Sequence, residues 1–190
     1  GEEEVVKLEG KLKELFTIRI FLVNIIVLII FWSVTSFNYY LITFQLQFLA
    51  GNIYNNAIFA AISDILAMLA SGLLMERMNL KVSFIAAYTI SLVGSIIYLI
   101  FANSHPNSVP YMILVTKFGV SATFNMVYIG NAKLFPPIIA GTAIGICNVF
   151  ARCSTILAPE VAELSLPTPL LVFAALCGLA ALAAFFLILK

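Results

Sequence analysis

The sequence predicts an all-α integral membrane protein with six transmembrane helices. Of its 190 residues, 63% are hydrophobic and only 10% are charged, whereas a soluble domain is about 25% charged. The mean hydropathy of +1.10 comes from apolar runs that reach the ~20 residues needed to cross a bilayer as a helix. Strands of a membrane β-barrel would be about half as long and would alternate in polarity, so helices are favoured.

Composition also argues against several functions. The net charge of +1 provides no basic field for nucleic acid. The three cysteines, Cys147, Cys153 and Cys177, all lie in apolar runs, which is typical of membrane helices rather than of a disulfide framework or metal site. No nucleophile with a base, no phosphate loop and no ligand cluster is visible. We therefore expect no enzyme activity, no metal and no cofactor.

The first element is a charged segment over residues 1–15. Val5, Leu8, Leu12 and Leu15 recur at helical spacing, which predicts a short amphipathic helix on the membrane surface or against a neighbour. Residues 16–190 form the predicted transmembrane domain. Its six spans cover residues 18–46, 52–75, 81–101, 110–134, 138–164 (interrupted late by Pro159) and 169–189.

The distribution of lysine and arginine predicts the orientation. With six spans, both termini share one side of the membrane. Eight cations fall on that side: Lys7, Lys11, Lys13, Arg19, Arg77, Lys81, Lys133 and Lys190. The opposite connections carry none, so we expect both termini to face the cytoplasm, or the matrix if the membrane is mitochondrial.

Three strongly ionisable residues remain within the predicted spans: Asp64, Lys117 and Arg152. A guanidinium stays charged, and placing one at mid-bilayer costs at least ~3 kcal/mol. One interpretation is a structural network in which Asp64 pairs with Lys117 and Arg152 is satisfied by carbonyls and Asn148. Another leaves Arg152 facing a cavity and an anionic solute. A third is a proton relay through Asp64.

Aromatic residues of the first span provide a second candidate feature. Trp and Tyr often mark the membrane interface, but Tyr39 and Tyr40 lie deeper along the predicted span. At least one must face the interior of the bundle. An aromatic wall could hold a flat organic solute by stacking, or a cation over a ring face.

The chain resembles the C-terminal six-helix half of a major facilitator superfamily transporter of the organic cation and organic anion branch. The most specific stretch runs through residues 117–125 and 131–136 and on to Arg152 and Pro159. There the family has a G-[KR]-x-G helix followed by N-A-E-L-[YF]-P and an eleventh helix. Residues 39–41 look like the seventh-helix tyrosine pair of that family.

The resemblance implies roles for individual residues. Arg152 matches the eleventh-helix arginine of anion-transporting members, and Tyr39 and Tyr40 would line the central cavity. We expect these three residues and Asn148 to bind the solute. Asp64 and Lys117 would form an intramembrane charge pair. Glu76, Arg77 and Lys81 would belong to the gating loop between the eighth and ninth helices.

The sequence also departs from the family pattern. The acid of N-A-E-L is Lys133, the arginine expected after that motif is replaced by Ala140, and one arginine of the gating loop is Leu80. These changes remove charged residues from the cytoplasmic clusters that such transporters use to hold one conformation.

Two functions follow from these observations. The first is one half of a secondary-active or facilitative carrier of small organic ions, with anions favoured, working by alternating access with a second six-helix half. The second is a transport-inactive structural subunit of a larger membrane complex, with the mitochondrion as one candidate location. In both, membrane lipid and a covering partner are required: a second half, a second copy of the chain, or other membrane subunits.

Overall fold

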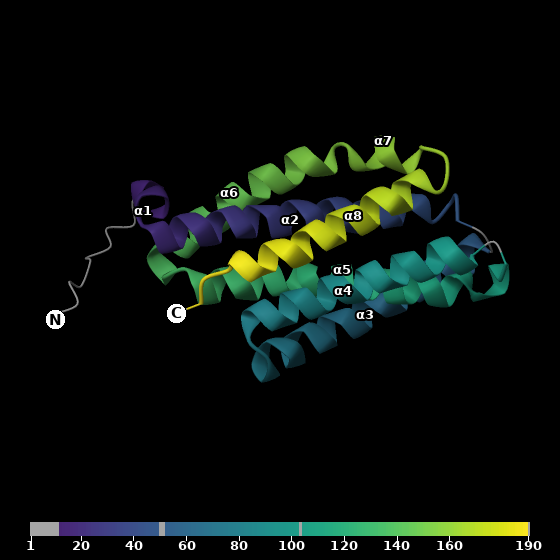
Figure 1. The fold of residues 1–190 in the computed structure, drawn as a ribbon, viewed down its shortest axis with the longest axis horizontal. Coiled ribbons are helices and arrows are strands. Elements are labelled where there is room, and N and C mark those ends of the chain that lie inside the picture. Colours follow the sequence, from purple (N-terminus) through teal and green to yellow (C-terminus); the bar gives the residue numbers. More distant parts are fainter. Residues whose placement is uncertain (1–11, 50–51, 103, 190) are drawn as a thin grey trace.

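The computed structural model describes residues 12–49, 52–102 and 104–189, and this part of the chain is helical throughout, without strands (Figure 1). Six of its helices are long and apolar enough to cross a membrane, which confirms the predicted fold class. They are α2 (Arg19–Gln45), α3 (Ile53–Arg77), α4 (Leu80–Phe101), α5 (Val109–Leu134), α6 (Pro137–Thr155) and α8 (Thr168–Ala183), which reaches membrane length with its continuation to Phe186.

Four short elements connect or flank these helices: α1 (Leu12–Thr17), η1 (Pro106–Ser108), α7 (Ala158–Ala162) and η2 (Ala184–Phe186). Of the amphipathic helix predicted over residues 1–15, residues 1–11 lie outside the described part, and the remainder falls in α1.

Local sequence signals explain where several helices begin. The side chain of Asn52 caps α3, because its Oδ1 accepts a hydrogen bond of 2.8 Å from the backbone N–H of Tyr54. Prolines occupy the first turns of α5, α6, α7 and α8, where a missing N–H costs nothing. The turns predicted from proline and asparagine therefore separate the helices.

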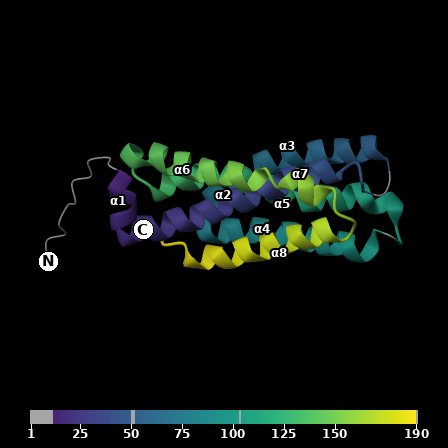
Figure 2. The ribbon, with the colours of Figure 1, turned by 90° about the horizontal axis from the view of Figure 1, so that it is seen from above.

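The six long helices form a bundle in which α2 and α5 are central. Helix α2 packs against α5, α6, α7 and α8, whereas α5 packs against α3 and α4. In Figure 2, α3 and α6 lie on one side of α2 and α5, and α4 and α8 lie on the other. Helices α3 and α6 are the least buried of the six, so their outer faces have no covering element within the described chain.

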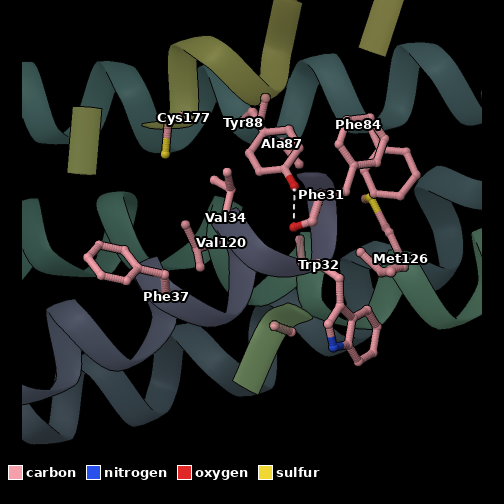
Figure 3. Close-up of a cluster of buried hydrophobic side chains, with 14 of the residues drawn as sticks. Phe31, Trp32, Val34, Phe37, Phe84, Ala87, Tyr88, Val120, Met126 and Cys177 are labelled. Carbon is pink, nitrogen blue, oxygen red and sulfur yellow. Dashed lines mark hydrogen bonds between the residues drawn. The ribbon is translucent and has the colours of Figure 1, made fainter. Parts of the chain in front are cut away.

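One cluster of the buried core brings together aromatic side chains from α2 and α4 with aliphatic neighbours (Figure 3). The rings of Phe31 and Phe84 lie 4.4 Å apart between centroids. The hydroxyl of the fully buried Tyr88 lies 2.8 Å from Oγ1 of Thr35 and 3.2 Å from the backbone oxygen of Phe31. The polar end of this large side chain is therefore satisfied inside the core.

Helices α4 and α5 approach closely because glycine lies at their contact. A Cβ built at Gly119 would lie 2.1 Å from the backbone oxygen of Ala87, and one built at Gly94 would lie 2.7 Å from the backbone nitrogen of Thr116. Neither position can hold a side chain without separating the helices. Small residues at helix contacts are typical of membrane bundles.

The fifth span is a broken helix. Helix α6 ends at Thr155, and α7 begins at Ala158 with Pro159 in its first turn. Proline has no N–H to donate to the carbonyl four residues earlier, which belongs to Thr155. This agrees with the late interruption expected at Pro159, and α6 is still long enough to be a candidate membrane span by itself.

Candidate solute-binding site

The candidate site is built around the carboxylate of Asp64, which lies on α3 and contacts two other helices. Nζ of Lys117 on α5 is 2.8 Å from Oδ2 of Asp64. The Ser121 hydroxyl, one turn further along α5, donates to Oδ1 at 2.5 Å. The Tyr39 hydroxyl on α2 donates to Oδ2 at 3.2 Å. A single carboxylate thus connects α2, α3 and α5 inside the membrane region.

The two charges of the ion pair differ in accessibility. The side chain of Lys117 is 6% exposed and that of Asp64 is 32% exposed. The ammonium is also covered by the Tyr39 ring, whose centroid lies 4.7 Å from Nζ, at a distance where a cation is attracted to a ring face. The open surface of the site therefore presents the carboxylate edge and aromatic rings rather than the ammonium.

An aromatic wall extends from this pair along α2 and α5. The ring of Tyr39 lies 5.6 Å from that of Tyr40 and 5.4 Å from that of Phe124 between centroids. The wall consists of Trp32, Tyr39, Tyr40 and Phe44 from α2 with Phe124 and Tyr128 from α5.

Sequence reasoning pointed to Tyr39 and Tyr40 and missed Phe124 and Tyr128. The signal was present, because residues 117, 121, 124 and 128 fall on one face of a helix at spacings of three and four.

A cavity of about 350 Å³ opens beside the ion pair. Its polar lining includes the Asp64 carboxylate and the Asn125 side chain, whose Nδ2 donates to the backbone oxygen of Ser121 at 3.2 Å. The full lining is Tyr39, Tyr40, Asp64, Met68, Ser121, Phe124 and Asn125.

The structure places Arg152 and Asn148 on a different helix from this cavity. Both lie on α6, one turn apart, with Arg152 exposed and Asn148 half-buried. Gly141 and Gly145 continue the same face, and a Cβ at either would meet no atom within 4 Å. Within the described chain, the Arg152 side chain has no hydrogen-bond or ion-pair partner. Helix α6 lies on the same side of the bundle as α3 (Figure 2).

The predicted gating residues lie at the end of α3 and the start of α4. Glu76 and Arg77 are exposed, whereas Nζ of Lys81 donates to the backbone oxygen of Phe185 at 2.9 Å. No ion pair joins these three residues, all of which lie in the described range 52–102. Lys81 instead connects α4 to the C-terminal segment through this hydrogen bond.

Comparison with known proteins identifies distant relatives among solute carriers. The chain is 28% identical over 135 residues to mouse solute carrier family 22 member 21, covering 69% of this chain and 23% of the relative. It is 28% identical over 135 residues to human organic cation/carnitine transporter 2, covering 69% and 24%. It is 27% identical over 173 residues to Arabidopsis organic cation/carnitine transporter 4, covering 90% and 33%. No protein-family model matches the sequence.

The chain is thus a distant homologue of the organic cation/carnitine transporters of solute carrier family 22, in the major facilitator superfamily. This confirms the resemblance predicted from the motifs, and the chain spans about a quarter to a third of the length of these relatives. The relatives are transporters and not enzymes, as the sequence predicted. The chain is therefore a multi-pass integral membrane protein that is homologous to transporters of small organic ions.

Proposed function

We propose that the chain is the C-terminal half of a secondary-active or facilitative transporter for small organic ions, working by alternating access with a second six-helix half. The observation that carries the proposal is the Asp64 site, where an ion pair, an aromatic wall and a cavity meet on one side of a six-helix bundle. Facilitators bind solutes between two such halves and rock one half against the other.

The uncovered side of the bundle supports the need for a partner. Arg152 is exposed on α6, and Met68 on α3 is 68% exposed next to the cavity. A charged and partly polar face is costly against lipid tails, so we propose that protein covers it. A second six-helix half fits this role best, and a second copy of the chain or other membrane subunits are the alternatives. We propose that both termini face the cytoplasm, or the matrix in a mitochondrial membrane.

Two charge sites of opposite sign define the solutes that the face can accept. The carboxylate edge of Asp64 and the rings of Tyr39 and Tyr40 favour an ammonium group. Arg152, with five N–H donors, favours a carboxylate or another anionic group, and Asn148 adds a polar contact beside it. The relatives' names refer to organic cations and carnitine and do not support the anion preference that the sequence predicted. An anionic group at Arg152 therefore stays a proposal.

Uptake by reconstituted vesicles tests the carrier role. The vesicles contain the chain together with the native partner that covers its face. Wild type and Arg152→Ala are compared for uptake of organic anions, and wild type and Asp64→Asn for uptake of organic cations. Lys13→Ala is the matched control, because Lys13 is an exposed cation away from the site. We expect Arg152→Ala to lose anion uptake and Lys13→Ala to retain it. Unchanged uptake in Arg152→Ala would remove Arg152 from the solute path. An absence of uptake in every form, with the covering partner present in the vesicles, would remove the carrier role.

The second candidate function is a transport-inactive structural subunit of a larger membrane complex. It is favoured by the gating residues, since Lys81 holds a backbone carbonyl and forms no ion pair with Glu76. In that case unrelated helices would cover the face of Tyr39 and Arg152, and the uptake experiment would give no signal while the protein co-purifies with a stable complex.

A further inference from the structure

A second cavity lies at the end of the bundle where α2 and α4 begin and α5 ends, away from the Asp64 site. It has a volume of about 200 Å³. The apolar side chains of Ile20, Leu80 and Leu134 line it together with Asn24, Lys133 and Ile188. The carrier mechanism proposed above assigns no role to this cavity.

The buried side-chain amide of Asn24 fixes one wall of this cavity by hydrogen bonding. Asn24 is 1% exposed, and its side chain pairs with both backbone groups of Ile188. Its Nδ2 donates to the Ile188 oxygen at 3.0 Å, and its Oδ1 accepts from the Ile188 N–H at 3.0 Å. The C-terminal segment is thereby fixed against α2, so the cavity has a defined wall formed by residues far apart in sequence.

One lysine, Lys133, lines this cavity, and neither its charge nor that of nearby Lys81 is compensated by a described carboxylate. Nζ of Lys133 donates to the backbone oxygen of Met75 at 2.8 Å, and Lys81, next to the lining residue Leu80, donates to the oxygen of Phe185. Both acceptors are neutral, and no carboxylate of the described ranges lies within ion-pair distance of either ammonium. An ammonium has three donors, so Lys133 has hydrogen bonds left to offer a ligand in the cavity.

We propose that this cavity binds the headgroup of an anionic phospholipid. The phosphate would accept from Lys133 at the exposed rim, and the glycerol and first acyl carbons would contact Ile20, Leu80 and Leu134. The apolar lining argues for an amphiphile, because a small hydrated anion gains nothing from it. Basic pockets between membrane helices are known to hold anionic headgroups.

Lipid binding to the purified full chain in neutral detergent tests the proposal. Native mass spectrometry measures retention of phosphatidylglycerol, phosphatidylcholine and inorganic phosphate by wild type, Lys133→Gln and Arg19→Gln. Arg19 is an exposed cation at the first residue of α2 and does not line the cavity, so it is the matched control. We expect phosphatidylglycerol to bind in preference to phosphatidylcholine, and Lys133→Gln to weaken it about fivefold.

Several outcomes would overturn the proposal. Equal losses in Lys133→Gln and Arg19→Gln would mean that only the diffuse charge of this end attracts the lipid. Inorganic phosphate that binds as well as phosphatidylglycerol would identify a small-anion site. A second variant, Leu134→Trp, fills the cavity without removing charge. Retention of phosphatidylglycerol by folded Leu134→Trp protein would show that the cavity is not the binding site.

Discussion

Removing the charge of Asp64 should destabilise the bundle more than removing the charge of Lys117. The reason is the difference in exposure across the ion pair, since the Lys117 side chain is 6% exposed and that of Asp64 is 32% exposed. Asp64→Asn leaves a buried ammonium without a counter-charge. Lys117→Met leaves a carboxylate that is partly open and still accepts hydrogen bonds from Ser121 and Tyr39.

The expected magnitudes follow from this asymmetry. Breaking a buried ion pair so that one charge is stranded costs about 3–5 kcal/mol, which we expect for Asp64→Asn. Loss of one charged hydrogen bond costs about 1.5–3 kcal/mol, which we expect for Lys117→Met. The double variant removes the stranded ammonium, so it should be more stable than Asp64→Asn alone.

Reversible unfolding of the full chain in mixed micelles, followed by the helical circular dichroism signal, provides the free energies of unfolding. Glu160→Gln is the control, because Glu160 is an exposed carboxylate on α7 and its loss should stay within about 0.5 kcal/mol. Equal losses in the two single variants, with the double variant losing their sum, would refute the claim that Asp64 and Lys117 act as one buried unit.

Two further predictions concern packing. Gly119→Ala should lower the free energy of unfolding by about 1–3 kcal/mol, because its Cβ would lie 2.1 Å from the oxygen of Ala87. The control Gly178→Ala, where a Cβ meets nothing within 4 Å, should be nearly neutral. Equal effects of the two variants in thermal unfolding would contradict the close contact at Gly119. Asn24→Ala removes both hydrogen bonds to Ile188 and should expose the C-terminal segment to carboxypeptidase, so unchanged digestion would show that these bonds do not hold the segment.

The long-range hydropathy pattern was sufficient to predict the fold class. In a membrane every backbone group must be satisfied within a helix or a closed barrel, so an apolar run of sufficient length has few alternatives. The same constraint made Asp64 and Lys117 natural partners, since two opposite charges in hydrocarbon stabilise each other. Proline at position 159 correctly indicated an interruption in the fifth span.

Details that depend on helix rotation could not be obtained in this way. Helical spacing places Phe124 and Tyr128 on the face of Lys117, but their contacts with the rings of α2 depend on how α5 is turned against α2. The separation of Arg152 from the Asp64 cavity likewise depends on which face of α6 contacts α2. The contact between Lys81 and Phe185 joins residues far apart in sequence and had no local signal.

The central claim is that the face carrying Asn125 and Asn148 lines a water-accessible solute path covered by a partner. Its most direct test is thiol labelling in the native membrane with a charged, membrane-impermeant reagent, in a background where the exposed Cys153 is replaced by serine. Cysteine placed at Asn125 or Asn148 should be labelled, and a saturating solute should slow the reaction. Cysteine at Leu179, which is 52% exposed on α8 and expected to face lipid, should stay unlabelled. Failure of labelling at both Asn125 and Asn148 would contradict the account, because it would show that water does not reach this face.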